Sequence, residues 1–206
     1  MKLTNRLFLA CILVAMAFAA QAQVIVEDTA RQGAFFASKK FTSNCYVGFE
    51  AQPGQILTNK AAMLVGFNLN WVVNHKYVVS AKYHTLTTQN DVRELVEPGS
   101  LNKVSLIHHY AGLGFSYILF HDKRFSLQPE LSAGWASAKF NYAGADRRHD
   151  YGAIIPAVYG TWNATKLFRV GVGLNYRAVI GSKFYGIGSM QLGGVSGVVF
   201  MRVGTF

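Results

Sequence analysis

Apolar residues alternate with small or charged residues most strictly at positions 167–178, LFRVGVGLNYRA. Every second position from Phe168 to Ala178 is apolar, and the positions between them carry two arginines, two glycines and an asparagine. Because successive side chains of a β-strand point to opposite faces, this pattern predicts a strand with one apolar face and one polar or small face. Arginines opposite an unbroken apolar row are typical of a membrane barrel, whose strands face lipid outside and a polar interior inside.

The same alternation recurs along the chain and predicts seven further strands. The second strand shows it well, since Val65, Phe67 and Leu69 alternate with Gly66, Asn68 and Asn70. In the least regular strand we take Ile154, Pro156, Val158 and Trp162 as the outward row, and in the last strand Val195, Val199, Met201 and Val203, with Ser196, Arg202 and Phe206 inward. The first of these seven strands begins near Asn44, and the last ends at Phe206. The other five cover 61–73, 77–85, 107–119, 125–135 and 152–162.

The predicted connections alternate in length. Short turns are expected at 74–76, 121–124 and 163–166, and long loops at 52–60, 89–103, 143–150 and 181–190. Pro53-Gly54 marks the first of these loops. Bacterial outer-membrane barrels have an even number of strands, short periplasmic turns and longer outside loops. With eight strands, both the N-terminus and the C-terminus of the barrel chain would lie on the periplasmic side. Pro129 and Pro156 lack an N–H for the strand ladder and are expected to mark bulges.

Composition supports a β-architecture. Aromatic residues make up 14% of the chain, and 20 glycines stand against 4 prolines. After residue 22 the sequence has no uncharged apolar run of the roughly 20 residues that a membrane-spanning helix needs. The sequence therefore predicts an all-β fold, a closed antiparallel eight-stranded transmembrane β-barrel.

The first residues have the pattern of an export signal. Lys2 and Arg6 precede an apolar stretch that ends at Ala20-Gln21-Ala22, an A-x-A cleavage site. We expect a signal peptide at 1–22, a periplasmic N-terminal lead-in at 23–42 and an outer-membrane barrel at 43–206. Cys45 is then the only cysteine of the exported chain, so no internal disulfide is expected.

Positive charge exceeds negative charge, with a formal net charge of +10. The basic residues are scattered along strands and loops, which disfavours nucleic acid as a partner. Outer-membrane lipid and lipopolysaccharide, which are acidic, are the partners that this charge favours.

Four stretches of the sequence carry a resemblance, namely NWVVNHKY, HHYAGLGFSYILFHDKRFSLQPELSAGW, NATKLFRVGVGLNYRAVIG and the ending LGGVSGVVFMRVGTF. They resemble a group of small eight-stranded outer-membrane β-barrel proteins common in Bacteroidota. The resemblance implies the fold and an envelope location, and it carries no assigned chemistry. Outer-membrane barrels end on an aromatic residue that the barrel assembly machinery reads, and Phe206 fits that role, with a bulge near Gly204 to reconcile it with the inward row.

Five charged residues are predicted to face the interior, which in an eight-stranded barrel is just wide enough for side chains. We interpret them as a structural charge cluster in which Glu130 pairs with Lys82, Arg202 or both, because these three lie at similar depth. Glu130 is the only acid placed deep inside. Water, loop acids such as Glu94 and Glu97, or a bound anion are left open as compensation for the excess positive charge. The cluster comprises Lys82, Glu130, Arg169, Arg177 and Arg202.

No catalytic, cofactor-binding or metal-binding residue is assigned. His108 and His109 are adjacent and face opposite sides of a strand, and His84 beside Thr85 and Thr87 has no H-x-S pair or placed acid to complete a catalytic set. We predict a structural or interaction protein with a packed polar interior rather than an open pore. It would present the loops at 89–103, 143–150 and 181–190 to an envelope or surface partner. The alternatives are an outer-leaflet enzyme acting on lipid A or phospholipid, and a barrel that binds a small ligand.

Aromatic residues near the predicted turns form a further pattern. Trp71, Tyr77, Phe125 and Trp162 lie at strand ends beside the short connections. We expect them to form an aromatic girdle at the periplasmic boundary of the bilayer.

Overall fold

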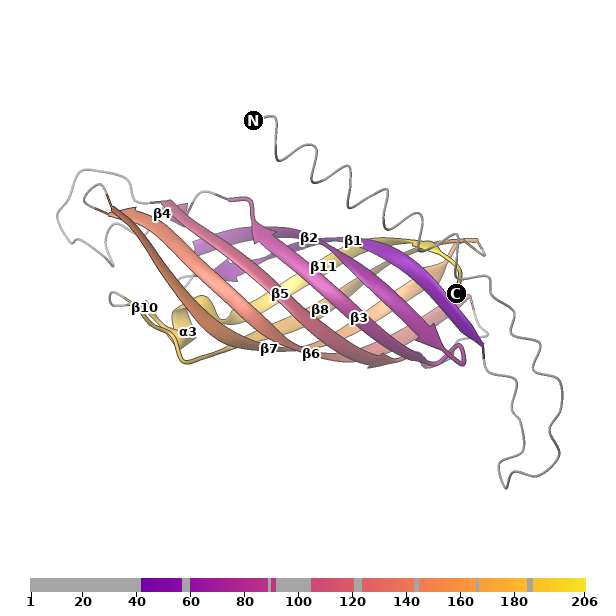
Figure 1. Cartoon of the computed structure of the whole chain (residues 1–206). Helices are drawn as coiled ribbons and strands as arrows, with labels where there is room; N and C mark the ends of the chain where they lie inside the picture. The colour runs from indigo at the N-terminus through magenta and orange to yellow at the C-terminus, as the bar shows by residue number, and fades with distance from the viewer. Residues whose placement is uncertain are drawn as a thin grey trace, which may run out of the picture.

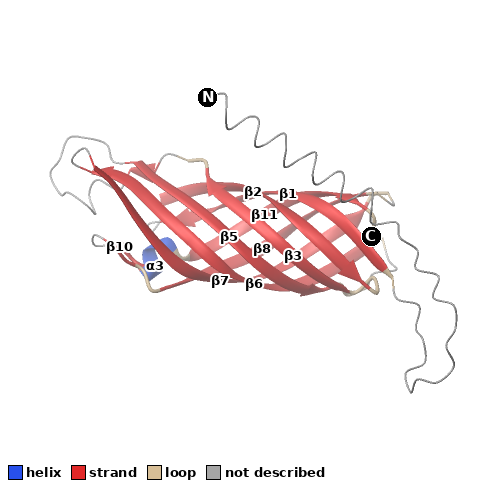
Figure 2. Ribbon diagram, viewed as in Figure 1, coloured by secondary structure: helices blue, strands red, loops and turns tan. Residues whose placement is uncertain are grey.

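The computed structural model describes residues 42–56, 60–88, 90–91, 105–120, 124–142, 145–165, 167–184 and 187–206. Eight long antiparallel strands form a closed barrel (Figures 1 and 2). The strand order is β3-β2-β1-β11-β8-β7-β6-β5, and pairing of β3 with β5 closes the sheet. These strands are β1 (Ser43–Ile56), β2 (Lys60–Val73), β3 (Tyr77–Leu86), β5 (Ser105–Tyr117), β6 (Phe125–Tyr142), β7 (Ala145–Asn163), β8 (Phe168–Ile180) and β11 (Gly194–Gly204).

The predicted closed eight-stranded barrel is therefore confirmed. Short elements accompany it: β4 (Asn90–Asp91), β9 (Lys183–Phe184), β10 (Ile187–Gly188) and the one-turn helix α3 (Ser189–Leu192). No helix in the described part of the chain is both long and apolar enough to cross a membrane. The predicted leader at 1–22, and residues 23–41 of the predicted lead-in, lie outside the described residues.

The predicted faces of the strands are also confirmed. On β8, Val172, Leu174 and Tyr176 are exposed on the outside, whereas Asn175 and Arg177 are buried. On β7 the ambiguous row resolves as predicted, with Ile154, Val158 and Trp162 outward. On β11 the predicted outward valines and Met201 are exposed, and Ser196 and Arg202 are buried. Because one register slip would exchange the two faces, this alternation fixes the pairing of the whole sheet.

The barrel has two unlike ends, which we call the turn end and the loop end. The turn end holds the 74–76 turn, the connections at 118–124 and 164–167, and the C-terminus (Figure 1). Asn74 and His75 have φ of 51° and 56°, and the Val73 carbonyl accepts a hydrogen bond from Lys76 N–H at 3.2 Å. Two central residues with positive φ characterise the hairpin turn that matches strand twist, and asparagine tolerates that conformation.

Strands reach further at the loop end than the sequence pattern indicates. The prediction of a loop at 52–60 is wrong for 52–56, because Pro53 and Gly54 lie within β1 and pair with Met63 and Ala62, and residues 57–59 lie outside the described part. The predicted loop at 143–150 is largely strand, since β7 begins at Ala145. The 181–190 segment contains β9, β10 and the start of α3. Of the 89–103 loop, residues 89 and 92–103 lie outside the described part.

The β6–β7 hairpin is the longest of the barrel, with strands of 18 and 19 residues, and it projects at the loop end (Figure 1). Its tip escaped prediction for a physical reason. Both faces of a strand that leaves the wall of the barrel can meet water, so the apolar alternation that marks the rest of the sheet is absent there.

Prolines interrupt the ladders without forming the predicted bulges. The β7–β8 pairing passes from Ile154 opposite Ala178 to Ala157 opposite Asn175, so Pro156 lies in a gap. Pro129 lies beyond the last pair of β5 with β6, Ser116 opposite Glu130. In the β7–β8 gap both strands contain the same number of residues, whereas a bulge requires an extra residue on one strand. The missing N–H is accommodated by an open ladder position.

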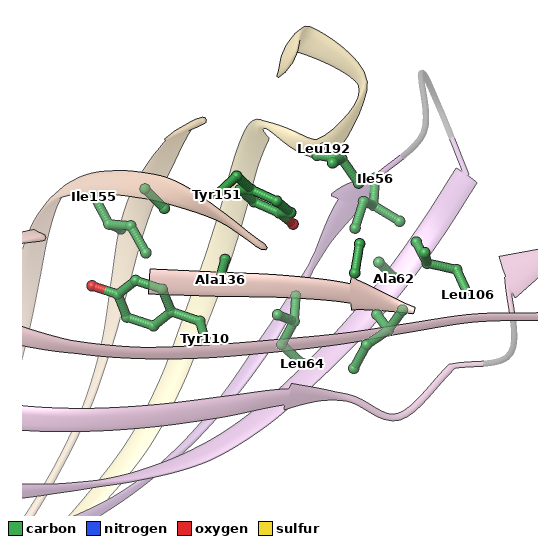
Figure 3. Close-up of a cluster of buried hydrophobic side chains, with 12 residues drawn as sticks. Ile56, Ala62, Leu64, Leu106, Tyr110, Ala136, Tyr151, Ile155 and Leu192 are labelled. Carbon is green, nitrogen blue, oxygen red and sulfur yellow. The ribbon is translucent and has the colours of Figure 1, made fainter. Parts of the chain in front are cut away.

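Three layers fill the interior. At the turn end, Tyr46, Val72, Val78 and Ile118 form an apolar turn-end layer, against which Phe206 packs. At the loop end lies a larger apolar loop-end layer (Figure 3). Between them lies a middle layer of mostly polar side chains, which also holds a small apolar cluster of Ala157, Tyr159, Val198 and Phe200. Its polar members include Glu50, Gln52, Asn68, Lys82 and Glu130. The predicted polar interior is therefore correct only for the middle layer. The loop-end layer comprises Ile56, Ala62, Leu64, Leu86, Leu106, Tyr110, Ala136, Ala138, Tyr151, Ala153, Ile155 and Leu192, with Val179 beside them.

Candidate functional site

An ion pair lies at the centre of the middle layer. Lys82 Nζ contacts the carboxylate of Glu130, and it lies 3.8 Å from Glu50 Oε1. The ammonium group also donates a hydrogen bond to the hydroxyl of Tyr159 at 3.1 Å, and that hydroxyl donates to Glu130 at 3.5 Å. All four side chains are buried. A buried cation is thus compensated by two carboxylates and a hydroxyl, as an ion pair removed from water requires.

Glu50 is the residue whose importance the sequence interpretation missed. Its Oε1 accepts a hydrogen bond from Asn68 Nδ2 at 2.5 Å, and its Oε2 lies 3.1 Å from both Gln52 Nε2 and His84 Nε2. The expectation that Glu130 is the only deep acid is wrong. Glu50 was assigned to the inward face but placed beside a loop at 52–60, whereas β1 continues for six residues beyond it.

Amides extend this network around the barrel wall. Gln52 Oε1 accepts a hydrogen bond from Asn175 Nδ2 of β8 at 3.2 Å, and Asn70 Nδ2 donates to Asn68. The bonds therefore connect β1, β2, β3 and β8 across the interior. These amides and carboxylates are therefore partnered within the protein, as buried polar groups require.

Arg202 lies beside this network, and among the residues that the structure describes its guanidinium is hydrogen-bonded to Gln128 rather than paired with Glu130. Its Nη1 donates to Gln128 Oε1 at 2.5 Å, and Gln128 Nε2 donates to Ser116 Oγ at 2.6 Å. The guanidinium carbon lies 4.1 Å from the ring centroid of Phe200 and 5.4 Å from that of Tyr159. Aromatic faces therefore supply part of the electrostatic stabilisation of this buried cation.

Arg169 belongs to the turn end and contacts the last residue of the chain. Its guanidinium carbon lies 3.8 Å from the ring centroid of Phe206, and the rings of Phe206 and Tyr46 are 4.7 Å apart. Gly204, with φ of 148°, lets the chain turn, and the Cys45 carbonyl accepts the N–H of Thr205 at 3.0 Å. The ring of Phe206 therefore packs against the interior. Its role as an assembly signal stays a prediction.

Arg177 lies in the loop-end layer, where its Nε donates to the carbonyl of Leu192 in α3 at 2.9 Å. The five predicted interior charges therefore do not form one cluster. The structure brings Lys82 and Glu130 together with Arg202 nearby, and it places Arg169 and Arg177 towards opposite ends of the barrel.

The histidines occupy different environments. His84 is buried inside with Glu50, whereas Thr85 belongs to the outward face and Thr87 donates its hydroxyl to the Met63 carbonyl at 2.8 Å. His108 faces inward, whereas His109 faces outward, with its Nδ1 2.9 Å from the hydroxyl of Tyr83. Within the described ranges, no group of three His, Cys, Asp or Glu residues is arranged to hold a metal ion.

The exterior carries an apolar band with aromatic boundaries. Trp71, Tyr77, Phe125 and Trp162, the residues of the predicted girdle, are exposed on the outside near the turn end. Towards the loop end, Trp135 is 77% exposed, and the next outward positions on β6 are Ser137 and Lys139. The outer face of β6 thus changes from apolar to polar beyond Trp135. An exposed ion pair of Arg148 and Asp150, with Nε and Oδ1 3.0 Å apart, lies on the projecting part of β7.

Comparison with known proteins identifies the architecture. No protein-family model matches the chain, and no curated protein sequence matches it. Among solved structures, neisserial surface protein A has a TM-score of 0.58 at 8% identity, covering 79% of this chain and 96% of its own. The attachment invasion locus protein Ail of Yersinia pestis, in complex with the heparin analogue sucrose octasulfate, has a TM-score of 0.51 at 15% identity, covering 80% and 97%. These similarities show the fold. It is that of small eight-stranded outer-membrane barrels, and the resemblance to barrels common in Bacteroidota stays a prediction.

Proposed function

We propose that this protein is an outer-membrane β-barrel with a structural or interaction role, which holds the loop end at the cell surface. The signal sequence predicted at 1–22 would export it, and the turn end would face the periplasm. Outer-membrane lipid and lipopolysaccharide would surround the apolar band. The barrel assembly machinery would recognise the C-terminal strand that ends at Phe206.

The observation that carries this proposal is the reversed polarity of the barrel. The middle layer is polar, whereas Leu113, Leu131 and Val172 on the outside are each more than half exposed. Soluble proteins rarely expose apolar surface of this extent, and a barrel that binds an apolar ligand in water requires the opposite arrangement. A bilayer satisfies the outer face, since strands that close on themselves leave no edge in lipid.

A packed interior supports a surface role rather than a pore. The middle layer is crossed by the hydrogen bonds of Glu50, Lys82 and Gln52, and apolar layers lie on both sides of it. The β6–β7 hairpin projects beyond the band and carries exposed charges. An enzyme of the outer leaflet receives no support from His84, because its ring is bonded to Glu50 inside the barrel.

Cysteine labelling in intact cells tests the proposed orientation. Arg148→Cys lies on the projecting hairpin and His75→Cys in a turn at the opposite end, and both are made with Cys45→Ser. We expect a membrane-impermeant maleimide to label Arg148→Cys in intact cells and His75→Cys only after permeabilisation. The reverse pattern would refute the orientation, and a mature protein extracted without detergent would refute the membrane location.

A further inference from the structure

The loop-end layer contains a buried cation in apolar surroundings. Arg177 is 3% exposed, and the leucines, isoleucines and alanines of the loop-end layer surround this part of the interior. Its Nε donates to the Leu192 carbonyl at 2.9 Å, whereas its buried Nη2 has no hydrogen-bond partner among the residues that the structure describes. An unpaired charge is costly in such a place, so the guanidinium calls for an additional acceptor.

Two further polar side chains lie close to Arg177. The rings of His108 and Tyr151 are 6.0 Å apart, and Tyr151 belongs to the same apolar layer as Leu192, whose carbonyl Arg177 binds. His108 is 0% exposed, and neither of its ring nitrogens has a hydrogen-bond partner in the described part of the chain. The same holds for the hydroxyl of Tyr151. Three adjacent side chains thus have unused hydrogen-bonding capacity.

The residues around these groups are small. Ala136, Ala138 and Ala153 face inward at this level, and each is at most 2% exposed. Ala136 lies opposite Tyr110 and Tyr151 in the sheet, and Ala138 lies opposite His108. Short side chains on neighbouring strands leave more of the interior to the long polar ones than leucine or phenylalanine would.

We propose that Arg177, His108 and Tyr151 form a binding site for a small oxyanion, a phosphate, sulfate or carboxylate group. The guanidinium supplies charge and N–H donors, the phenol one O–H and a neutral imidazole one N–H. An oxyanion accepts several hydrogen bonds at once and neutralises the guanidinium, and charge-assisted bonds of this kind are the strong ones. The site goes beyond the surface role proposed above and does not depend on it.

Helix α3 lies beside this site. Arg177 holds the carbonyl at the end of α3, and Leu192 is fully buried in the loop-end layer. His149 is half-buried, stacks on Tyr151 with ring centroids 6.3 Å apart, and has Nε2 3.4 Å from the Gly181 carbonyl. Ring contacts therefore connect the half-buried His149 through Tyr151 to the buried His108.

Anion titration of the full mature protein, folded in detergent micelles, tests the site. Sodium phosphate, sulfate and acetate are compared with sodium chloride at constant ionic strength, and the midpoint of the heat-dependent change in gel mobility is measured. We expect a saturable rise of the midpoint with at least one oxyanion and none with chloride, because binding to the folded state alone raises stability. Phosphate or sulfate selectivity would indicate a tetrahedral group, and acetate selectivity a carboxylate.

Variants locate the effect. Arg177→Gln should weaken oxyanion binding about tenfold or more, since it removes the charged donor. Arg169→Gln, which alters the buried arginine at the turn end, should leave binding unchanged. Tyr151→Phe removes one hydroxyl without changing shape and should weaken binding, whereas Tyr46→Phe in the turn-end layer should not. The two phenylalanine variants keep the test decisive should Arg177→Gln fail to fold.

Three results would overturn the proposal. One is an equal effect of chloride, and another is oxyanion binding that Arg177→Gln and Tyr151→Phe both leave intact. The third is a wild-type protein whose midpoint no oxyanion raises.

Discussion

Buried positive charge is compensated differently in the middle layer and in the loop-end layer of the same barrel. In the middle layer Lys82 contacts Glu130 and lies near Glu50, and amides from neighbouring strands complete the hydrogen bonds of the carboxylates. In the loop-end layer Arg177 is surrounded by apolar residues. Among the residues that the structure describes, its hydrogen-bond partner is the backbone carbonyl of Leu192 in α3. The cation of the first arrangement is paired with carboxylates inside the protein, whereas the guanidinium of the second has capacity for a further group.

This difference separates structural charge from charge that is available for binding. A buried ion pair contributes little net stability relative to an apolar core, but removal of one partner is strongly destabilising. The middle layer should therefore be sensitive to single substitutions. The loop-end layer should tolerate loss of its cation, because no carboxylate that the structure describes there would be left without a partner.

Lys82→Met should produce the largest effect. It leaves Glu50 and Glu130 buried without their shared cation, and we expect a loss of about 3–5 kcal/mol in the free energy of unfolding. Urea-induced unfolding in lipid vesicles measures this loss. Lys76→Met, in the turn between β2 and β3, is the matched control and should change stability by no more than about 0.5 kcal/mol. Equal stability of the two variants would show that the middle-layer ion pairs are absent in the folded protein.

Leu131→Arg tests the outer face of the same wall. Leu131 lies within the apolar band, directly outside the middle layer to which its neighbour Glu130 belongs. An arginine near the bilayer midplane of a barrel costs about 2–4 kcal/mol, and one near the interface about 0–1 kcal/mol. Unfolding in vesicles should therefore separate Leu131→Arg from Ser137→Arg, which lies beyond Trp135. Equal stability losses would argue against a lipid-facing band with this boundary.

Arg177→Met should have the smallest effect of the three. The variant loses the hydrogen bond to Leu192 but also removes a buried charge from an apolar layer, so we expect a loss of at most about 1–2 kcal/mol without added oxyanion. The same unfolding assay measures it. A loss as large as that of Lys82→Met would mean that Arg177 has a carboxylate partner of its own, and the contrast between the two layers would be wrong.

The sequence predicts the barrel wall well because a closed sheet between lipid and a filled interior imposes a period of two on every strand. The outward row from Phe168 to Tyr176 and the inward Asn175 and Arg177 follow from that period alone. Strand ends are different. Pro53-Gly54 has the composition of a loop, yet within a barrel the paired backbone of β2 holds it in a strand.

The candidate sites were predicted less well, because they depend on depth and on contacts between distant strands. Lys82 and Glu130 could be matched in depth by counting from the turns, whereas Glu50 was underestimated once β1 was thought to end early. Nothing in the local sequence shows that α3 would fold over Arg177, or that the loop-end layer would be apolar. Residues 177 and 192 meet through the closure of the β8–β11 connection, which alternation does not encode.

A double-mutant cycle on Lys82 and Glu130 tests the central claim most directly, namely that the interior of the barrel is sealed by charges paired within the middle layer. The free energies of unfolding of the wild type, Lys82→Met, Glu130→Gln and the double variant are compared in lipid vesicles. We predict a coupling energy of about 1–3 kcal/mol, because residues in direct ionic contact lose the same interaction in either single variant. Additivity within about 0.5 kcal/mol would contradict the account, since that is the behaviour of residues that do not interact.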